Sequence, residues 1–166
     1  MARRTWVVAA VVAVILAAVA VAVLRPWASG PGRCAAEVED PLDPRSLQHA
    51  LAGVSPTYAT EPPTSGPHQP GRLPGGVVAE PLPGPVQVGA LEEGQVLLQH
   101  RGLVATERLR LEAFAGPLVI VAPNPALPSK VVASAWRTRQ LCGGVDDAAL
   151  VRFIDDHAGH ASHLAG

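Results

Sequence analysis

The chain has 166 residues, of which 48% are hydrophobic, and a formal net charge of −1. The ~140 residues that follow an apolar N-terminus suffice for one domain with a hydrophobic core, but not for two. After Leu24, 11 Lys and Arg residues stand against 14 Asp and Glu residues, a net charge of −3. This balance excludes the basic surface typical of proteins that bind nucleic acid.

The first element is an apolar run over residues 6–24, which contains no charge, Gly, Pro or hydroxyl. As a helix this run is ~28 Å long, close to the ~30 Å hydrocarbon core of a bilayer. Arg3 and Arg4 precede it, which favours a cytoplasmic N-terminus. The sequence therefore predicts a cytoplasmic tail at 1–5 and a transmembrane signal anchor at 6–24. A linker at 25–40, an exported domain at 41–158 and a flexible tail at 159–166 follow.

A cleaved secretory signal is the alternative, because Ala18-Val19-Ala20 and Ala20-Val21-Ala22 both have the small-x-small form of a cleavage site. The apolar region of such signals is usually about 7–15 residues long, and this run continues past both sites. We therefore expect a single-pass protein of the cytoplasmic membrane with its C-terminal domain outside the cytoplasm.

Two cysteines, Cys34 and Cys142, lie in the predicted exported part. In an oxidising compartment an isolated pair most simply forms a disulfide. Two free thiols are the alternative, and the absence of a C-x-x-C motif argues against a redox-active pair.

The N-terminal half of the exported part contains few regular elements. Leu42-Asp43-Pro44 is typical of a helix start, and Gly53 would end that helix. Between Pro56 and Pro85, nine of thirty residues are Pro, which excludes a helix or a central strand there. This stretch is either an ordered extended wrap or a flexible loop.

The C-terminal half predicts three strands, at 95–100, 118–122 and 131–136. Residues 104–115 fit either a strand or a helix, and their Leu and Phe spacing favours a helix. Asp146 or Asp147 would cap a last helix with Leu150, Phe153, Ile154 and His157 on one face, ended by Gly159. This order predicts an α+β domain with a mainly antiparallel sheet and a C-terminal helix.

The most distinctive motif is Pro62-Pro63-Thr64-Ser65-Gly66-Pro67-His68, followed downstream by Leu91-Glu92-Glu93-Gly94-Gln95-Val96. Together they resemble the family called domain of unknown function 3105, across roughly residues 34–157. The resemblance implies an exported or membrane-anchored bacterial protein and assigns no activity. This chain departs from the family pattern, H-x-L-E-H, by having Gly89 and Glu93 in place of its two histidines.

The residues left by this comparison form a candidate metal site: His49, His68, Glu92 and Glu93. Imidazole and carboxylate groups suit a divalent metal, which commonly takes three or four ligands. Glu92 and Glu93 would point to opposite faces in a strand, so only a turn would let both bind. The alternative, which we favour, is structural: His68 fixes the Pro-rich segment onto the sheet and Glu92 satisfies backbone donors there.

Other chemistry finds little support in the sequence. Ser65 lies three residues from His68, but no G-x-S-x-G elbow and no phosphate-binding glycine loop is present. His157, His160 and His163 near the C-terminus fit a solvated tail better than a metal site.

The sequence thus predicts a membrane-anchored, non-enzymatic envelope or interaction module without a cofactor. Residues 6–24 would contact the membrane, and the protein partner is unknown. The alternative is a metal-binding or metal-dependent protein that uses the His/Glu cluster.

Overall fold

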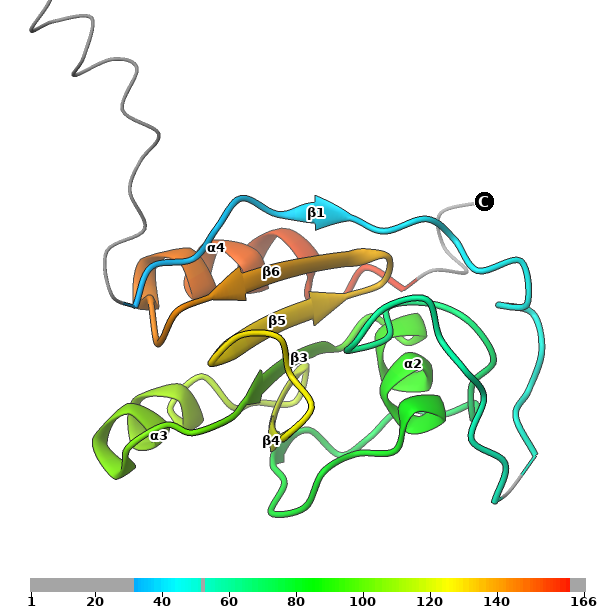
Figure 1. The fold of residues 1–166 in the computed structure, drawn as a ribbon, viewed down its shortest axis with the longest axis horizontal. Helices are drawn as coiled ribbons and strands as arrows, with labels where there is room; N and C mark the ends of the chain where they lie inside the picture. Colours follow the sequence, from blue (N-terminus) through cyan, green and yellow to red (C-terminus); the bar gives the residue numbers. More distant parts are fainter. Residues whose placement is uncertain (1–31, 52, 162–166) are drawn as a thin grey trace, which may run out of the picture.

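A six-stranded mixed sheet forms the centre of the computed structural model, which describes residues 32–51 and 53–161 (Figure 1). In spatial order the strands are β1 (Val38–Glu39), β6 (Thr138–Cys142), β5 (Val131–Ala135), β3 (Val96–His100), β4 (Val119–Pro123) and β2 (Gly76–Val77). The strands predicted at 95–100, 118–122 and 131–136 are confirmed as β3, β4 and β5 to within one residue at each end.

The α+β class is confirmed, but the sheet is mixed rather than mainly antiparallel. β3 pairs with β4 and β4 with β2 in parallel, whereas the β3–β5, β5–β6 and β1–β6 pairs are antiparallel. The reason is α3 (Ala105–Glu112), which connects β3 to β4. A helix between two strands lets the chain return to the starting edge, so the strands can run in the same direction.

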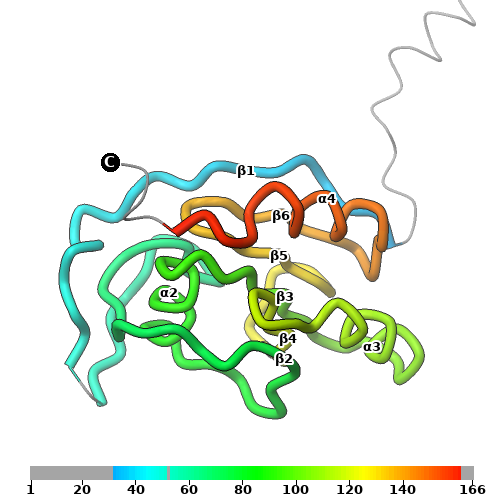
Figure 2. Tube along the Cα trace, turned by 180° about the vertical axis from the view of Figure 1, so that it is seen from behind, coloured from blue at the N-terminus to red at the C-terminus, as the bar shows by residue number. Residues whose placement is uncertain are grey.

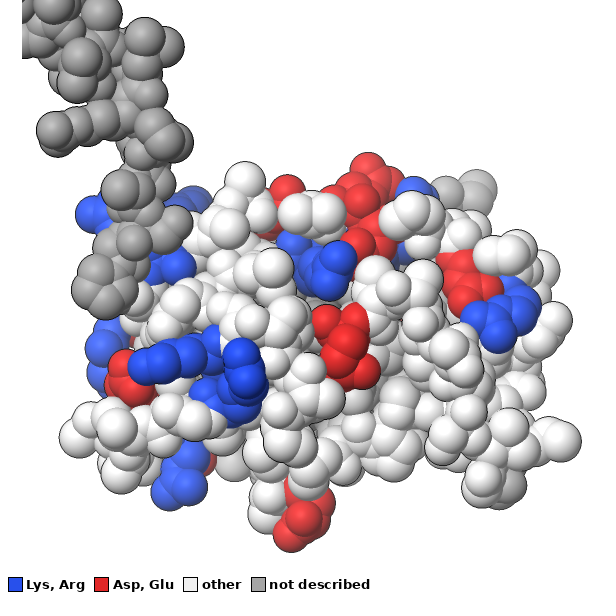
Figure 3. All heavy atoms as spheres, in the orientation of Figure 1, with Lys and Arg blue, Asp and Glu red and all other residues white. Residues whose placement is uncertain are grey.

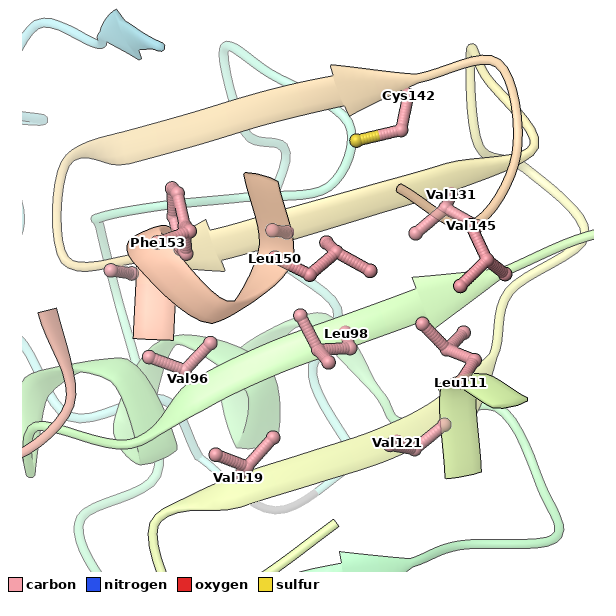
Figure 4. Packing of buried hydrophobic residues seen from close by; sticks show 12 residues of the cluster. Val96, Leu98, Leu111, Val119, Val121, Val131, Cys142, Val145, Leu150 and Phe153 are labelled. Carbon is pink, nitrogen blue, oxygen red and sulfur yellow. The ribbon is translucent and has the colours of Figure 1, made fainter. Parts of the chain in front are cut away.

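Helices cover both faces of the sheet (Figures 1 and 2). On one face, α3 and α4 (Asp147–His157) place Leu111, Leu150 and Phe153 against the strands in the larger apolar cluster (Figure 4). On the other face, α2 (Gly84–Glu92) contributes Ala90 and Leu91, which pack against β3 and β4. Alternate residues of β3 therefore face different helices, as a strand buried on both sides requires.

The C-terminal helix begins and ends as the sequence predicts. The Asp146 carboxylate accepts a hydrogen bond from the Ala149 N–H at 3.3 Å and caps α4. Leu150 and Phe153 are fully buried, and Gly159, with φ of 89°, follows the end of the helix.

The helix predicted from Leu42 to Gly53 is wrong. Residues 44–47 form a turn, and the chain then extends so that His49 bridges His68 in parallel. The N–H of Ala50 donates to the carbonyl of His68 at 2.7 Å, and the His68 N–H donates to the carbonyl of Gln48. Pairing with the Pro-rich segment thus takes the backbone groups that a helix would use.

The Pro-rich stretch is an ordered wrap that ends in a helix the sequence did not predict. α2 begins directly after Pro83 and has Pro85 in its first turn. Proline is tolerated there, because the first N–H groups of a helix have no partner within it.

Cys34 and Cys142, which are 108 residues apart in the sequence, form a disulfide. Their backbones also pair as an isolated antiparallel β-bridge. The predicted disulfide is therefore present. The anchor predicted at 6–24 lies outside the described residues. Within 32–51 and 53–161, no helix is long and apolar enough to cross a membrane.

Candidate functional site

The PPTSGPH motif is buried along its whole length, from Pro62 to His68. Thr64 Oγ1 donates to the Asp40 carboxylate at 2.9 Å, and Ser65 Oγ accepts a hydrogen bond from the Asp43 N–H at 3.0 Å. The Gly66 N–H donates to Ser46 Oγ at 3.0 Å. The motif thus fastens the segment 40–46 to the body of the domain.

Tyr58 closes over the motif from the preceding part of the wrap. Its hydroxyl donates to the Pro67 carbonyl at 2.6 Å, and a Cβ on Gly66 would lie 3.1 Å from the ring. Gly66 has a φ of 122°, a backbone conformation that residues other than glycine rarely adopt. Burial raises the pKa of Tyr58 to about 12.

His68 ends the motif and connects it to α2. Its ring is 2% exposed, and Nδ1 lies 3.1 Å from the Gly66 carbonyl, which can only accept, so Nδ1 carries a proton. Nε2 lies 2.6 Å from Oε2 of Glu92. Despite this short distance, Nε2 is not aligned for a hydrogen bond with any described group. The two side chains are therefore in close contact without a hydrogen bond between them.

The structure brings His68 beside both His49 and Glu92, but the three do not form a set of metal ligands. The rings of His49 and His68 meet edge to face, with centroids 5.3 Å apart. Over residues 32–51 and 53–161, no group of three or more His, Cys, Asp or Glu side chains is placed to hold a metal ion. The metal site of four residues remains a prediction. Of these residues, His68 and Glu92 have side-chain donor atoms in direct contact.

Glu92 and Glu93 lie at the C-terminal end of α2, so the strand geometry that would separate their side chains does not apply. Glu92 is the last helical residue and Glu93 is the C-cap. Positions 89, 92 and 93 therefore share one helical face, at i, i+3 and i+4.

Gly89 allows the wrap to lie directly against α2. A Cβ at this position would come within 1.9 Å of the Gln69 carbonyl oxygen, and the Gln69 N–H donates to the Pro85 carbonyl. Backbone thus fills the space that a side chain at position 89 would need. In this chain, position 89 cannot supply a metal ligand without moving the wrap.

Ser65 and His68 do not form a nucleophile–base pair. Ser65 Oγ is bonded to the backbone of Asp43 and Pro41, whereas the His68 ring faces Gly66 and Glu92. At the C-terminal end of α4, His157 Nε2 lies 2.9 Å from a Glu37 carboxylate oxygen. His163 lies outside the described residues, so the C-terminal histidine group stays untested.

Two hollows flank the residues Leu42, Asp43 and Pro44, with volumes of about 400 and 370 Å³. The larger hollow also contacts Arg45, Thr60 and Thr64. The smaller one is completed by Ser46, Leu47, Glu92 and Trp136. Reasoning from sequence missed Trp136 as a surface residue because it continued the apolar strand 131–136. The structure places it on the two-residue turn between β5 and β6.

Asp43 and Arg45 form the charged side of the larger hollow. Arg45 Nε and Nη2 donate to the two carboxylate oxygens of Asp43 at 3.0 and 2.6 Å, and these bonds lower the pKa of Asp43. The charge of Asp43 is therefore already paired.

A family model described as "Protein of unknown function (DUF3105)" matches residues 49–165. No curated protein matches the chain. No solved structure matches it either.

Proposed function

The chain belongs to the family described as protein of unknown function DUF3105, and on that premise we propose that it is a non-enzymatic interaction module outside the cytoplasm. Residues 6–24 would anchor it to the cytoplasmic membrane, so that the domain binds a protein partner at the outer face.

The observation that carries this proposal is a run of exposed apolar side chains along one segment. Leu42, Leu47, Leu51 and Val54 have exposed fractions of 51, 95, 74 and 53%. Isolated exposed apolar residues are ordinary, whereas four of them along one short segment favour an interaction surface. We call these four residues the leucine surface.

The burial of the motif supports a binding rather than a catalytic role. The polar groups of Thr64 and Ser65 are bonded to the domain's own backbone and to Asp40, and His68 is almost inaccessible. Hydroxyls used in this way hold the fold together, and the buried His68 ring has little surface left for a substrate.

Charge distribution supports a protein partner over nucleic acid. Figure 3 shows basic and acidic residues interspersed on one face of the domain, with uncharged areas between them. Nucleic-acid binding relies on many Lys and Arg side chains gathered to neutralise phosphates.

The leucine surface lies far from the point where the chain would enter the membrane. Residues near 32 and residues 42–51 occupy opposite ends of the domain in both Figure 1 and Figure 2. An anchor at 6–24 would therefore leave this surface free to meet a partner.

Two experiments test the proposal. Alkaline phosphatase fused after Gly166 should be active in cells, and a fluorescent protein at the same position should be dark; the reverse pattern would overturn the anchor.

For the interface, a photo-cross-linking residue at Leu47 should capture a discrete partner. The same residue at Leu109, which is 62% exposed on α3, should not. Equal capture at both positions would contradict the leucine surface.

Binding of a divalent metal is the second candidate, favoured by the 2.6 Å approach of His68 Nε2 to Glu92 Oε2. Two side-chain donors leave most coordination positions to other ligands, so we expect weak binding at most. Purified protein should be assayed for bound metal before and after His68→Ala. Stoichiometric metal that is lost in the variant would establish this candidate in place of the module.

A further inference from the structure

We propose that the smaller hollow receives a basic side chain of the protein partner, with Glu92 as the acceptor of its charge and Trp136 as its aromatic wall. This inference rests on the proposed function and names the chemistry of the partner.

The walls of this hollow suit the apolar stem of a Lys or Arg side chain. Leu42, Pro44, Leu47 and Trp136 line it together with two carboxylates and one hydroxyl. Long basic side chains bury their methylene groups along such walls and keep the charged end at a polar group. An aromatic ring beside that end adds a cation–π attraction.

Glu92 is the open charge in the hollow. Its side chain is 23% exposed, and Oε2 is held beside His68. Among the residues described, no hydrogen bond or ion pair involves Oε1 of Glu92. The contact with His68 involves Oε2 alone, which leaves Oε1 for a ligand.

The neighbouring cations do not fill this role. Arg45 lines the other hollow and is bound to Asp43, and no Lys, Arg or His side chain lines the smaller one. Arg137, next to Trp136 in the chain, pairs with Glu39 at 2.7 Å. Since Asp43 is already paired with Arg45, Glu92 is the acidic group of this hollow that remains to complement a cation.

Apolar residues beside the cation define the rest of the partner segment. Leu47 and Leu42 border the hollow and belong to the leucine surface. A segment in which a basic residue is flanked by leucine-sized residues would cover both features at once. The amine of a lipid headgroup would carry the same charge, but this surface lies at the opposite end of the domain from residue 32, which follows the predicted anchor, and this favours a protein.

The test uses the full chain in detergent micelles, with Trp6→Phe and Trp27→Phe so that Trp136 is the sole tryptophan. The probes are acetyl-Leu-Lys-Leu-amide and the same peptide with norleucine in place of lysine. We expect the lysine peptide to change the Trp136 emission and to bind about tenfold more tightly than the norleucine peptide. Equal affinities, or no emission change up to the solubility limit of the lysine peptide, would overturn the inference.

A matched pair of variants checks the acceptor. Glu92→Gln should weaken the lysine peptide about threefold to tenfold, whereas Glu93→Gln, one residue beyond and not in the hollow, should not change it. Equal weakening in both variants would show a general charge effect and contradict the site. The wild-type peptide comparison decides the question even if Glu92→Gln does not fold.

These outcomes are separable from the broader proposal. Cross-linking at Leu47 without preference for the lysine peptide would leave the module standing and remove only the cation site. Binding of the lysine peptide without a cross-linked partner would support the cation site and contradict the interaction module.

Discussion

Asp40 and Glu39 are neighbours in the chain, yet their ion pairs differ in burial. The Asp40 side chain is 5% exposed and lies 3.1 Å from Arg139, whereas the Glu39 side chain is 70% exposed beside Arg137. We expect Asp40→Asn to lower the free energy of unfolding by about 2–4 kcal/mol, because it leaves Arg139 partly buried without its partner. Glu39→Gln should change it by less than about 0.5 kcal/mol. Urea unfolding of both variants measures the difference, and similar values would contradict this account of Asp40.

Tyr58 is the only tyrosine, so its ionisation can be followed without interference. Burial raises its pKa to about 12, against the ordinary value of 10. Between these two pH values the unfolded chain loses the phenol proton and the folded chain keeps it, so stability falls as pH rises from 10 to 12. Absorbance near 295 nm should show the phenolate only towards pH 12, and a transition at pH 10 in the folded protein would contradict burial of the ring.

At the scale of elements, the contact between the wrap and α2 depends on a missing side chain. We expect Gly89→Ala to destabilise the domain by about 1–3 kcal/mol, because the new Cβ would overlap the Gln69 carbonyl. The gain of about 1 kcal/mol in helix propensity does not compensate. Gly116→Ala is the control, since a methyl group added at Gly116 would have no neighbouring atom within 4 Å. Thermal melting should separate the two variants, and an equally stable Gly89→Ala protein would contradict this packing.

Local sequence signals predicted elements well where local bonds decide the structure. Asp146 caps α4 through its own neighbour Ala149, and β3, β4 and β5 are apolar runs that are buried on both faces. The segment 42–53 failed because its helix-start signals compete with distant partners. The Asp43 carboxylate accepts the Arg45 N–H at 2.8 Å, as at a helix start. The chain nevertheless makes only a turn over residues 44–47, because the Asp43 N–H bonds to Ser65 and His49 pairs with His68.

The candidate site was predicted only in part, because its residue types can be read from the sequence and their three-dimensional setting cannot. His68 and Glu92 were selected by residue type, and the structure brings them to 2.6 Å. Their setting was missed, because α2 begins within a proline-rich stretch and periodicity gives no sign of a nine-residue helix there. Glu92 therefore lies on a helix beside a hollow, and the Trp136 that completes the hollow comes from a turn 44 residues later in the sequence.

For the whole molecule, the first and last parts of the domain are joined at the same edge. β1 pairs with β6, and the Cys34 N–H donates to the carboxylate of Asp146, which also caps α4. The 32–40 segment therefore belongs to the folded body, and the predicted linker over 25–40 is structured in its second half.

The disulfide between Cys34 and Cys142 makes that connection covalent, so its removal should destabilise the domain. A cross-link across 108 residues lowers the entropy of the unfolded chain, by an amount worth about 4–5 kcal/mol in the loop-closure model. We expect the double variant Cys34→Ala, Cys142→Ala to lose about 2–5 kcal/mol of unfolding free energy in urea. Reduction of the parent protein should cause a similar loss, and reduction of the double variant should have no effect. A parent protein that is equally stable with and without reductant would show that the hydrogen bonds of β1 hold this edge without help from the disulfide.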